Sequence, residues 1–225
     1  MPMANRAYIG IWTRGYSEAV MLDHFERLLG TVPLSPKQPG FTGLVIRAMS
    51  PSEVPLLEQN LRGSVAGAAE VVALAREYRN ADSTYEVEGD WDLWQRDPES
   101  GWWQRQPEQL LLICNGEAYD DGVAADSGHF LVDVGFEHRF TGHAGLLGSH
   151  ETRSAPADPV EAEFLALMDK EEDLREYYEK TRENIQQLMA WSQAIEQALP
   201  VERYRLWSEG EVNLEARLDE ILAVR

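Results

Sequence analysis

The sequence contains a single cysteine among its 225 residues, which excludes a disulfide bond within the chain. A lone thiol is typical of proteins that function in a reducing compartment, so we expect a cytoplasmic protein. The thiol belongs to Cys114, at the end of the apolar run 110–113. A cysteine in such a run is expected to be buried and inert rather than to act as a nucleophile.

Long apolar runs are also missing. A membrane-spanning helix needs about 20 consecutive apolar residues, and no stretch of this chain approaches that length. Residues 1–6 lack the basic start and apolar segment of a signal peptide. We therefore expect neither a membrane segment nor a secretion signal.

Basic side chains are scarce. The chain has 20 Lys and Arg against 39 Asp and Glu, which gives a net charge of −19. Residues 1–83 are balanced, whereas residues 84–150 carry a net −10 and residues 151–225 a net −9. Phosphate binding requires clusters of Lys and Arg, so we expect no nucleic-acid partner. The sign of the charge favours a cationic partner instead.

The remaining composition is that of a globular protein, with 44% hydrophobic and 26% charged residues. The N-terminal portion, residues 1–96, reads as strand–helix–strand–strand–helix–strand. Those elements are expected at 7–13, 17–29, 43–49, 54–61, 64–78 and 84–96. Pro55 restricts the strand expected at 54–61 to a sheet edge, and a short helix is the alternative there. This order predicts a ferredoxin-like portion, which by itself implies no function.

Residues 97–150 are expected to continue the sheet as a β-hairpin and meander. The run 110–114 is apolar at every position, which indicates a central strand. Asn115-Gly116 is the strongest two-residue hairpin signal in the chain. A polar loop is expected at 120–128 and a further strand at 129–140.

The C-terminal region, residues 151–225, is expected to be mainly helical. Apolar residues between 160 and 199 recur at spacings of four and three, which predicts one long helix or two with a break near 169–173. We expect this helix to pack on the chain's own sheet, with a coiled-coil homodimer as the alternative. A last strand is expected at 203–207 and a helix at 212–224. The three portions could together form one compact domain.

The strand expected at 84–96 has the most unusual pattern. Its side chains alternate between two sheet faces. One face carries Tyr85, Val87, Gly89, Trp91 and Leu93, and the other carries Glu86, Glu88, Asp90, Asp92 and Trp94. Four carboxylates in a row repel one another, more strongly where solvent is excluded. We call the second set the acidic ladder. It predicts a surface that binds a basic partner, with Trp94 as an aromatic anchor, although an ordinary solvated sheet face explains the same pattern.

Catalytic and metal-binding motifs are weak. His129, Asp133 and Glu137 share a face of one expected strand, but residues four apart in a strand lie about 13 Å from one another. Ligands of one ion lie about 2 Å from it. The ladder carboxylates are spaced about 7 Å apart along the strand, without the flanking arrangement that glycoside hydrolysis requires. No catalytic residue, metal site or cofactor is assigned.

The sequence thus predicts an α+β protein with an antiparallel sheet, a ferredoxin-like N-terminal portion, a β-meander and C-terminal helices packed on the sheet. The expected function is non-enzymatic: an acidic cytoplasmic protein, monomeric or homodimeric, that binds a basic protein as an adaptor or a toxin-neutralising protein. The alternative is a small-molecule hydrolase, with or without a metal ion. Its pocket would combine the carboxylates of 86–92 with the histidines of 129–150.

Overall fold

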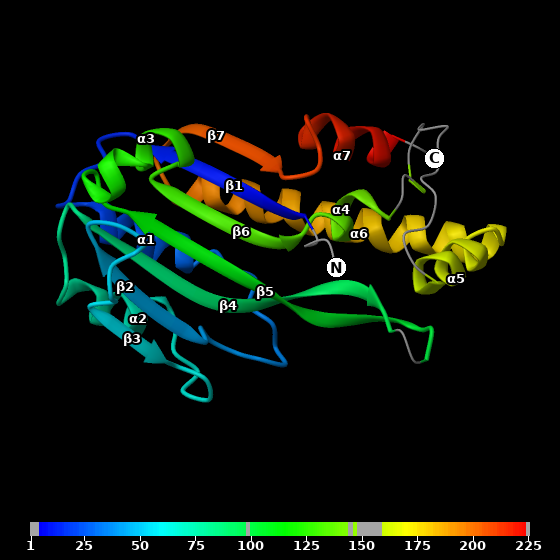
Figure 1. The fold of residues 1–225 in the computed structure, drawn as a ribbon, viewed down its shortest axis with the longest axis horizontal. Coiled ribbons are helices and arrows are strands. Elements are labelled where there is room, and N and C mark those ends of the chain that lie inside the picture. Colours follow the sequence, from blue (N-terminus) through cyan, green and yellow to red (C-terminus); the bar gives the residue numbers. More distant parts are fainter. Residues whose placement is uncertain (1–4, 98–99, 144–145, 148–158, 224–225) are drawn as a thin grey trace.

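A computed structural model describes residues 5–97, 100–143, 146–147 and 159–223 (Figure 1). Its strands form one seven-stranded sheet in which every pairing is antiparallel. The strands are β1 (Arg6–Thr13), β2 (Gly43–Ala48), β3 (Leu57–Asn60), β4 (Ser83–Arg96), β5 (Trp103–Asn115), β6 (Phe130–Phe136) and β7 (Val201–Ser208). The protein is therefore α+β, as the sequence predicts.

The helices occur between and after the strands. They are α1 (Met21–Leu29), α2 (Ala68–Arg76), the 3₁₀ turn η1 (Tyr119–Gly122), α3 (Ala124–Ser127), α4 (His138–Thr141), α5 (Pro159–Leu167), α6 (Glu171–Ala198) and α7 (Leu214–Ala223). None of the described helices has both the length and the apolar character needed to cross a membrane.

The strand order in the sheet is β3-β2-β4-β5-β6-β1-β7. The first strand is hydrogen-bonded on both sides, as expected, but its neighbours are β6 and β7. The elements up to β4 follow each other along the chain in the predicted order. The ferredoxin-like arrangement is nevertheless not confirmed, because β5 and β6 separate β1 from β4. All three predicted portions contribute strands to the one sheet.

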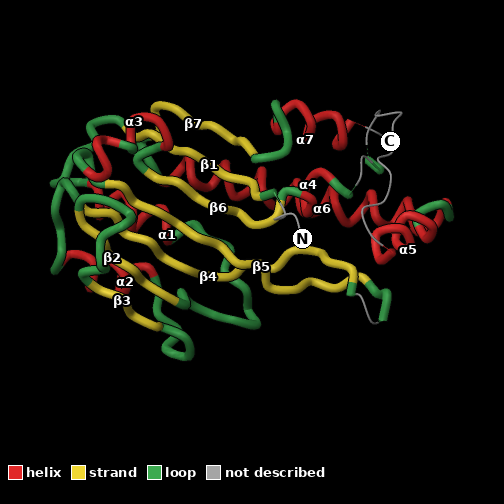
Figure 2. Tube along the Cα trace, viewed as in Figure 1, coloured by secondary structure: helices red, strands yellow, loops and turns green. Residues whose placement is uncertain are grey.

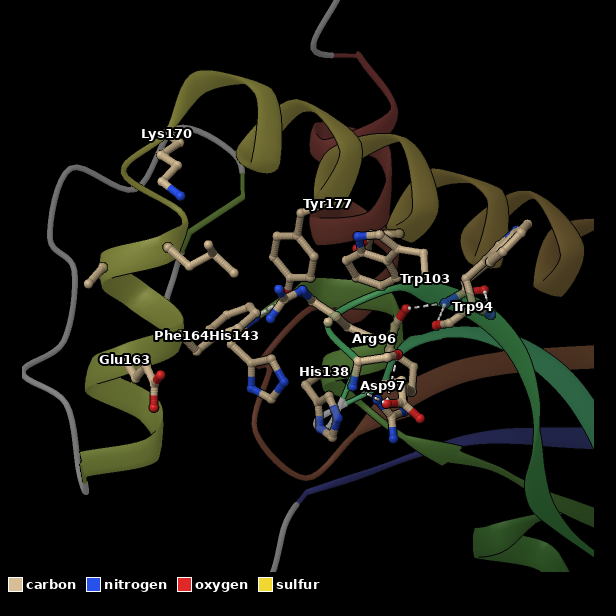
Figure 3. A pocket seen from close by; sticks show the side chains of 17 residues that line it. Trp94, Arg96, Asp97, Trp103, His138, His143, Glu163, Phe164, Lys170 and Tyr177 are labelled. Atoms are coloured by element: carbon tan, nitrogen blue, oxygen red, sulfur yellow. Dashed lines mark hydrogen bonds between the residues drawn. The ribbon is translucent and has the colours of Figure 1, made fainter.

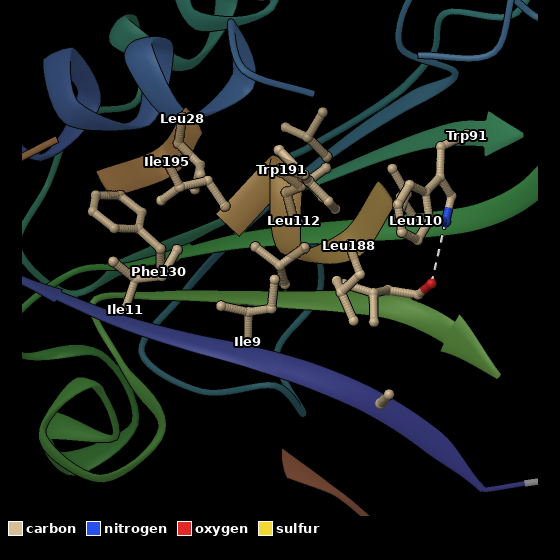
Figure 4. Close-up of a cluster of buried hydrophobic side chains, with 14 of the residues drawn as sticks. Ile9, Ile11, Leu28, Trp91, Leu110, Leu112, Phe130, Leu188, Trp191 and Ile195 are labelled. Atoms are coloured by element: carbon tan, nitrogen blue, oxygen red, sulfur yellow. Dashed lines mark hydrogen bonds between the residues drawn. The ribbon is translucent and has the colours of Figure 1, made fainter. Parts of the chain in front are cut away.

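The core lies between one face of the sheet and the helices α1, α2 and α6. Figure 4 shows Leu188, Trp191 and Ile195 of α6 in one cluster with Ile9 and Leu112 of the sheet, all of them buried. Burying such side chains stabilises the fold by about 1.5–3 kcal/mol each relative to exposure. Along each strand, side chains that face this core alternate with side chains on the other face of the sheet. A period-two pattern in the sequence therefore identifies the core residues.

The apolar stripe of 160–199 forms two helices. α5 ends at Leu167, and α6 begins at Glu171 after Lys170, whose backbone is extended. Three acidic residues occupy the first turn of α6, where they interact favourably with the positive end of the helix dipole. The stripe packs on the chain's own sheet: Ile185 and Leu188 are fully buried, and Leu174 is partly buried.

Three local predictions differ from the structure. Asn115-Gly116 makes no tight hairpin, because η1 and α3 separate β5 from β6. The glycine is required by a close approach of two segments of the chain: a Cβ on Gly116 would lie 2.3 Å from the carbonyl oxygen of Ala81. The strand expected at 129–140 ends at Phe136, and the chain then turns into α4, which packs against α6. The loop expected at 120–128 contains α3.

The helices lie mainly on one face of the sheet. In Figure 1, α1 and α6 lie behind the strands, and α3 lies in front of one end of β6 and β1. Figure 2 shows the strands as a continuous layer with α6 running along behind it. In the part of the chain that the structure describes, no helix covers the front of the sheet over the middle of β4 and β5. We call this surface the open face.

Candidate functional site

The acidic ladder lies on the open face. The opposite face of β4 carries Tyr85, Val87, Trp91 and Leu93, all of which are inaccessible to solvent beneath the helices. Glu86, Glu88 and Asp90 are half-buried. The division of β4 into an apolar and an acidic face thus follows the sequence pattern, and the acidic side chains face away from the helical layer.

Two of these carboxylates have no ion pair among the described residues. Glu86 lies 3.4 Å from the guanidinium of Arg47 on β2, whereas Glu88 and Asp90 have no Lys or Arg within salt-bridge distance in the described ranges. Burial raises the pKa of Asp90; the charge of Arg62 opposes this shift and that of Asp92 adds to it. Burial also raises the pKa of Glu86, against the effect of Arg47. The ladder therefore carries like charges that are partly desolvated.

Asp92 is less accessible than its neighbours. Only 9% of its surface is exposed, and its Oδ1 atom has no hydrogen-bond partner among the described residues. Its backbone carbonyl accepts a hydrogen bond of 3.1 Å from Nε2 of Gln187 on α6. A partner cannot reach Asp92 without displacing surrounding atoms, so its contribution to a docking surface is its charge.

Trp94 is held by the chain itself. Its Nε1 atom donates to Glu183 at 2.5 Å, and the ammonium of Lys180 lies 4.0 Å from the ring centroid. The guanidinium of Arg105 lies 5.4 Å from the same centroid. These contacts occupy the ring and the Nε1–H group of Trp94, which are the parts that an aromatic anchor would present to a partner. We therefore restrict the carboxylates of the proposed docking surface to Glu86, Glu88 and Asp90.

Aliphatic side chains lie beside the ladder. Cross-strand pairing places Leu111 of β5 opposite Glu88, and Ile113 of β5 and Val45 of β2 opposite Glu86. All three aliphatic side chains are half-buried. Where one face of an antiparallel sheet is exposed to water, the residues on that face are normally polar. The continuous apolar run 110–114 was the signal for this patch, but from the sequence it indicated only a central strand.

A separate pocket lies at the far end of the β4–β5 hairpin, where the hairpin meets α4, α5 and α6 (Figure 3). Its volume is about 650 Å³, and 17 residues line it. They are Trp94, Arg96, Asp97, Ser100, Gly101, Trp103, His138, Arg139, His143, Glu163, Phe164, Ala166, Leu167, Lys170, Tyr177, Thr181 and Asn184. Six of these side chains carry aromatic rings, counting the two imidazoles.

The pocket does not unite the groups of the hydrolase hypothesis. His138 and His143 line it, but none of the four ladder carboxylates does. Burial lowers the pKa of His138 to about 2, with smaller effects from His143 and Arg139. Its imidazole is therefore neutral at physiological pH. His150 falls outside the described residues.

The other candidate groups of the sequence have structural roles. His129 accepts the backbone N–H of Thr13 at 3.0 Å. Asp133 is hydrogen-bonded to Arg6, and Glu137 accepts the N–H of Gly210 at 2.9 Å. Cys114 is fully buried, and burial raises its pKa to about 12. No group of three metal-ligating side chains is assembled within the described ranges.

No protein-family model matches this chain, and neither the curated proteins nor the solved structures contain a match. Function therefore has to be inferred from the open face and the pocket.

Proposed function

We propose that this protein is a non-enzymatic, acidic cytoplasmic protein that binds a basic protein partner through its open face. An adaptor or toxin-neutralising role fits this mode of action. The contact surface consists of Glu86, Glu88 and Asp90 on β4 together with Leu111 and Ile113 on β5. A partner that presents Lys or Arg around an apolar centre complements this surface in charge and in hydrophobicity.

The observation that carries the proposal is the apolar character of β5 on both of its faces. Leu110, Leu112 and Cys114 pack beneath the helices, while Leu111 and Ile113 lie on the open face. Aliphatic side chains surrounded by polar groups are the composition of a protein–protein interface, with an apolar centre and a charged rim. A sheet face that served only solubility would carry polar residues at these positions.

Electrostatics supports a cationic partner. The like charges of Glu86, Glu88 and Asp90 repel one another across a partly desolvated surface, and among the described residues only Glu86 of the three forms an ion pair. A Lys or Arg placed over Glu88 and Asp90 would relieve this repulsion. The net charge of −19 would also steer a basic protein toward the chain over distances set by the Debye length, about 10 Å at 0.1 M salt.

The test is a charge reversal with a matched control. Glu88→Lys with Asp90→Lys changes the charge of the open face, while Glu176→Lys with Glu179→Lys makes the same change in net charge at exposed positions of α6. Binding partners are captured from the native cytoplasm with the wild-type protein. Association and dissociation rates are then measured for each variant with the purified partner, at low and high salt.

We expect the open-face reversal to slow association by about tenfold or more and to reduce the salt dependence. The α6 reversal should have a much smaller effect. Leu111→Asn should mainly speed dissociation, because it removes apolar contact from the centre of the interface. Thermal unfolding checks that each variant is folded. Equal association rates for wild type and the Glu88/Asp90 reversal would contradict the proposal, as would capture of acidic proteins alone.

A further inference from the structure

The pocket at the end of the β4–β5 hairpin is distinct from the open face and has a different chemistry. Its volume of about 650 Å³ falls within the range of small-molecule sites, which is about 300–1,000 Å³. Figure 3 shows Trp103 and Tyr177 on one side, His138 and His143 on the other, and Arg96 between them. The open-face proposal makes no use of any of these residues.

The walls are a connected series of rings. Trp103 stacks on Tyr177 with centroids 5.6 Å apart, and Phe164 meets the same Tyr177 edge-on at 5.5 Å. His143 contacts Phe164 edge-on at 5.4 Å and stacks on His138 at 4.2 Å. The Tyr177 hydroxyl accepts the backbone N–H of His143 at 2.8 Å. Rings fixed in this way offer flat surfaces against which a planar group can stack.

Among the described residues, Arg96 is the cation of the pocket that lacks an acidic partner. Its side chain is half-buried, and no carboxylate lies within salt-bridge distance of it in the described part of the chain. The other cations differ: Arg139 lies 3.3 Å from Glu108, and Lys170 lies 3.9 Å from Asp173. Removing a guanidinium from water without a counter-ion costs free energy. Acidic residues outnumber basic ones by nearly two to one in this chain, so the lack of a partner for Arg96 is not due to a shortage of carboxylates.

The carboxylate nearest to Arg96 in sequence is committed elsewhere. Asp97 accepts hydrogen bonds from the backbone N–H and the hydroxyl of Ser100, at 2.7 and 2.9 Å. It also accepts one from Gln104 at 2.9 Å. These contacts hold the hairpin loop together. Arg96 thus lines the pocket without a counter-ion among the described residues, and Figure 3 shows it between the two aromatic walls.

We propose that this pocket binds an organic anion with a planar ring, its phosphate or carboxylate on Arg96 and its ring against the aromatic walls. The planar fork of a guanidinium matches such oxyanions through two parallel hydrogen bonds. The neutral imidazole of His138 adds a polar contact without carrying a charge of its own. Aryl and nucleoside phosphates and aromatic carboxylates belong to this ligand class.

The test compares probes that separate the two features. Phenyl phosphate and AMP carry both a ring and an anion, inorganic phosphate carries only the anion, and adenosine carries only the ring. Affinities are measured by calorimetry and by quenching of tryptophan fluorescence. We expect both ring-bearing anions to bind at least about tenfold more tightly than inorganic phosphate or adenosine.

Matched variants locate the site. Arg96→Gln should weaken binding of phenyl phosphate at least about tenfold, whereas Arg79→Gln, at an exposed position of the surface, should leave it unchanged. Trp103→Leu should weaken binding of the ring, whereas Trp102→Leu should not, because Trp102 is 77% exposed.

Three results would overturn the proposal: no binding of either ring-bearing anion, equal affinity for inorganic phosphate, or unchanged affinity in Arg96→Gln. Arg96→Gln changes a half-buried side chain that forms no ion pair with the described residues, so we expect it to leave the fold intact even if Trp103→Leu does not.

Discussion

Asn184 of α6 replaces a missing neighbouring strand at the end of β4. β2 pairs with β4 only as far as Glu88, and the last bridge on that side is made by Leu34 to Trp91. Beyond it, Oδ1 of Asn184 accepts the backbone N–H of Trp94 at 2.8 Å, and Nδ2 donates to the Trp94 carbonyl at 3.1 Å. The same Nδ2 donates to the carbonyl of Arg139 in α4 at 3.1 Å.

We predict that Asn184→Leu destabilises the protein by about 3 kcal/mol. The substitution keeps a side chain of similar size but removes three hydrogen bonds, each with a net value of about 0.5–1.5 kcal/mol. Three main-chain groups at this largely buried position lose their partners. For a protein of this length, a loss of that size lowers the melting temperature by about 6–12 °C.

Asn184→Asp separates hydrogen bonding from side-chain shape. It keeps the acceptor for Trp94 but places a carboxylate oxygen opposite two carbonyl oxygens. We expect it to be at least as destabilising as Asn184→Leu at neutral pH and to recover partly in acid, where a protonated carboxyl can donate.

The assay is urea unfolding followed by circular dichroism. Gln186→Leu is the control, because Gln186 is exposed on the same helix, and it should change stability by less than about 0.5 kcal/mol. If Asn184→Leu also lies within that limit, Asn184 does not hold β4 and α4 together.

Three further predictions concern the core, a histidine and a glycine. Leu188→Ala should cost about 2–5 kcal/mol in urea unfolding, because Leu188 is fully buried against the sheet; a stability that depends on protein concentration would instead indicate an intermolecular coiled coil. Burial lowers the pKa of His138 from 6.5 to about 2. Below pH 6.5 the imidazole is therefore protonated in the unfolded chain but not in the folded protein, and the free energy of unfolding decreases as the pH is lowered. His138→Phe should reduce the loss between pH 7.5 and 5 by up to about 2 kcal/mol, and an unchanged pH profile would show that the imidazole is not neutral in the fold. Gly116→Ala should cost about 1–3 kcal/mol in thermal unfolding, because its Cβ would lie 2.3 Å from the Ala81 carbonyl oxygen; Gly30→Ala, with nearest atoms at 3.4 Å, is the control and should be close to neutral.

The open face illustrates what a single strand can and cannot predict. Period-two alternation assigned Glu86, Glu88 and Asp90 to one face of β4 correctly, because that periodicity follows from backbone geometry alone. The accessibility of each position depends on neighbouring elements. Asp92 is largely buried and Trp94 is engaged by α6, and neither contact has a local signal in residues 84–96.

The sequence by itself determined the elements whose patterns are long and regular. The strands expected at 7–13 and 84–96, the apolar run 110–114 and the helical stripe of 160–199 were all located from apolar runs or periodicity, but the stripe left open whether it forms one helix or two. Propensity signals were less reliable. Asn115-Gly116 has the composition of a tight turn, but Gly116 serves a close approach to Ala81, which lies 35 positions earlier in the chain.

Only the tertiary structure decided the order of the strands and the position of the pocket. β1 lies between β6 and β7 because side chains more than 100 residues apart share one core, and no local pattern encodes that pairing. Arg96, His138 and Tyr177 come from a hairpin, a short helix and a long helix. Each residue is unremarkable within its own segment. Their common site exists because packing of α4, α5 and α6 against the hairpin brings them together.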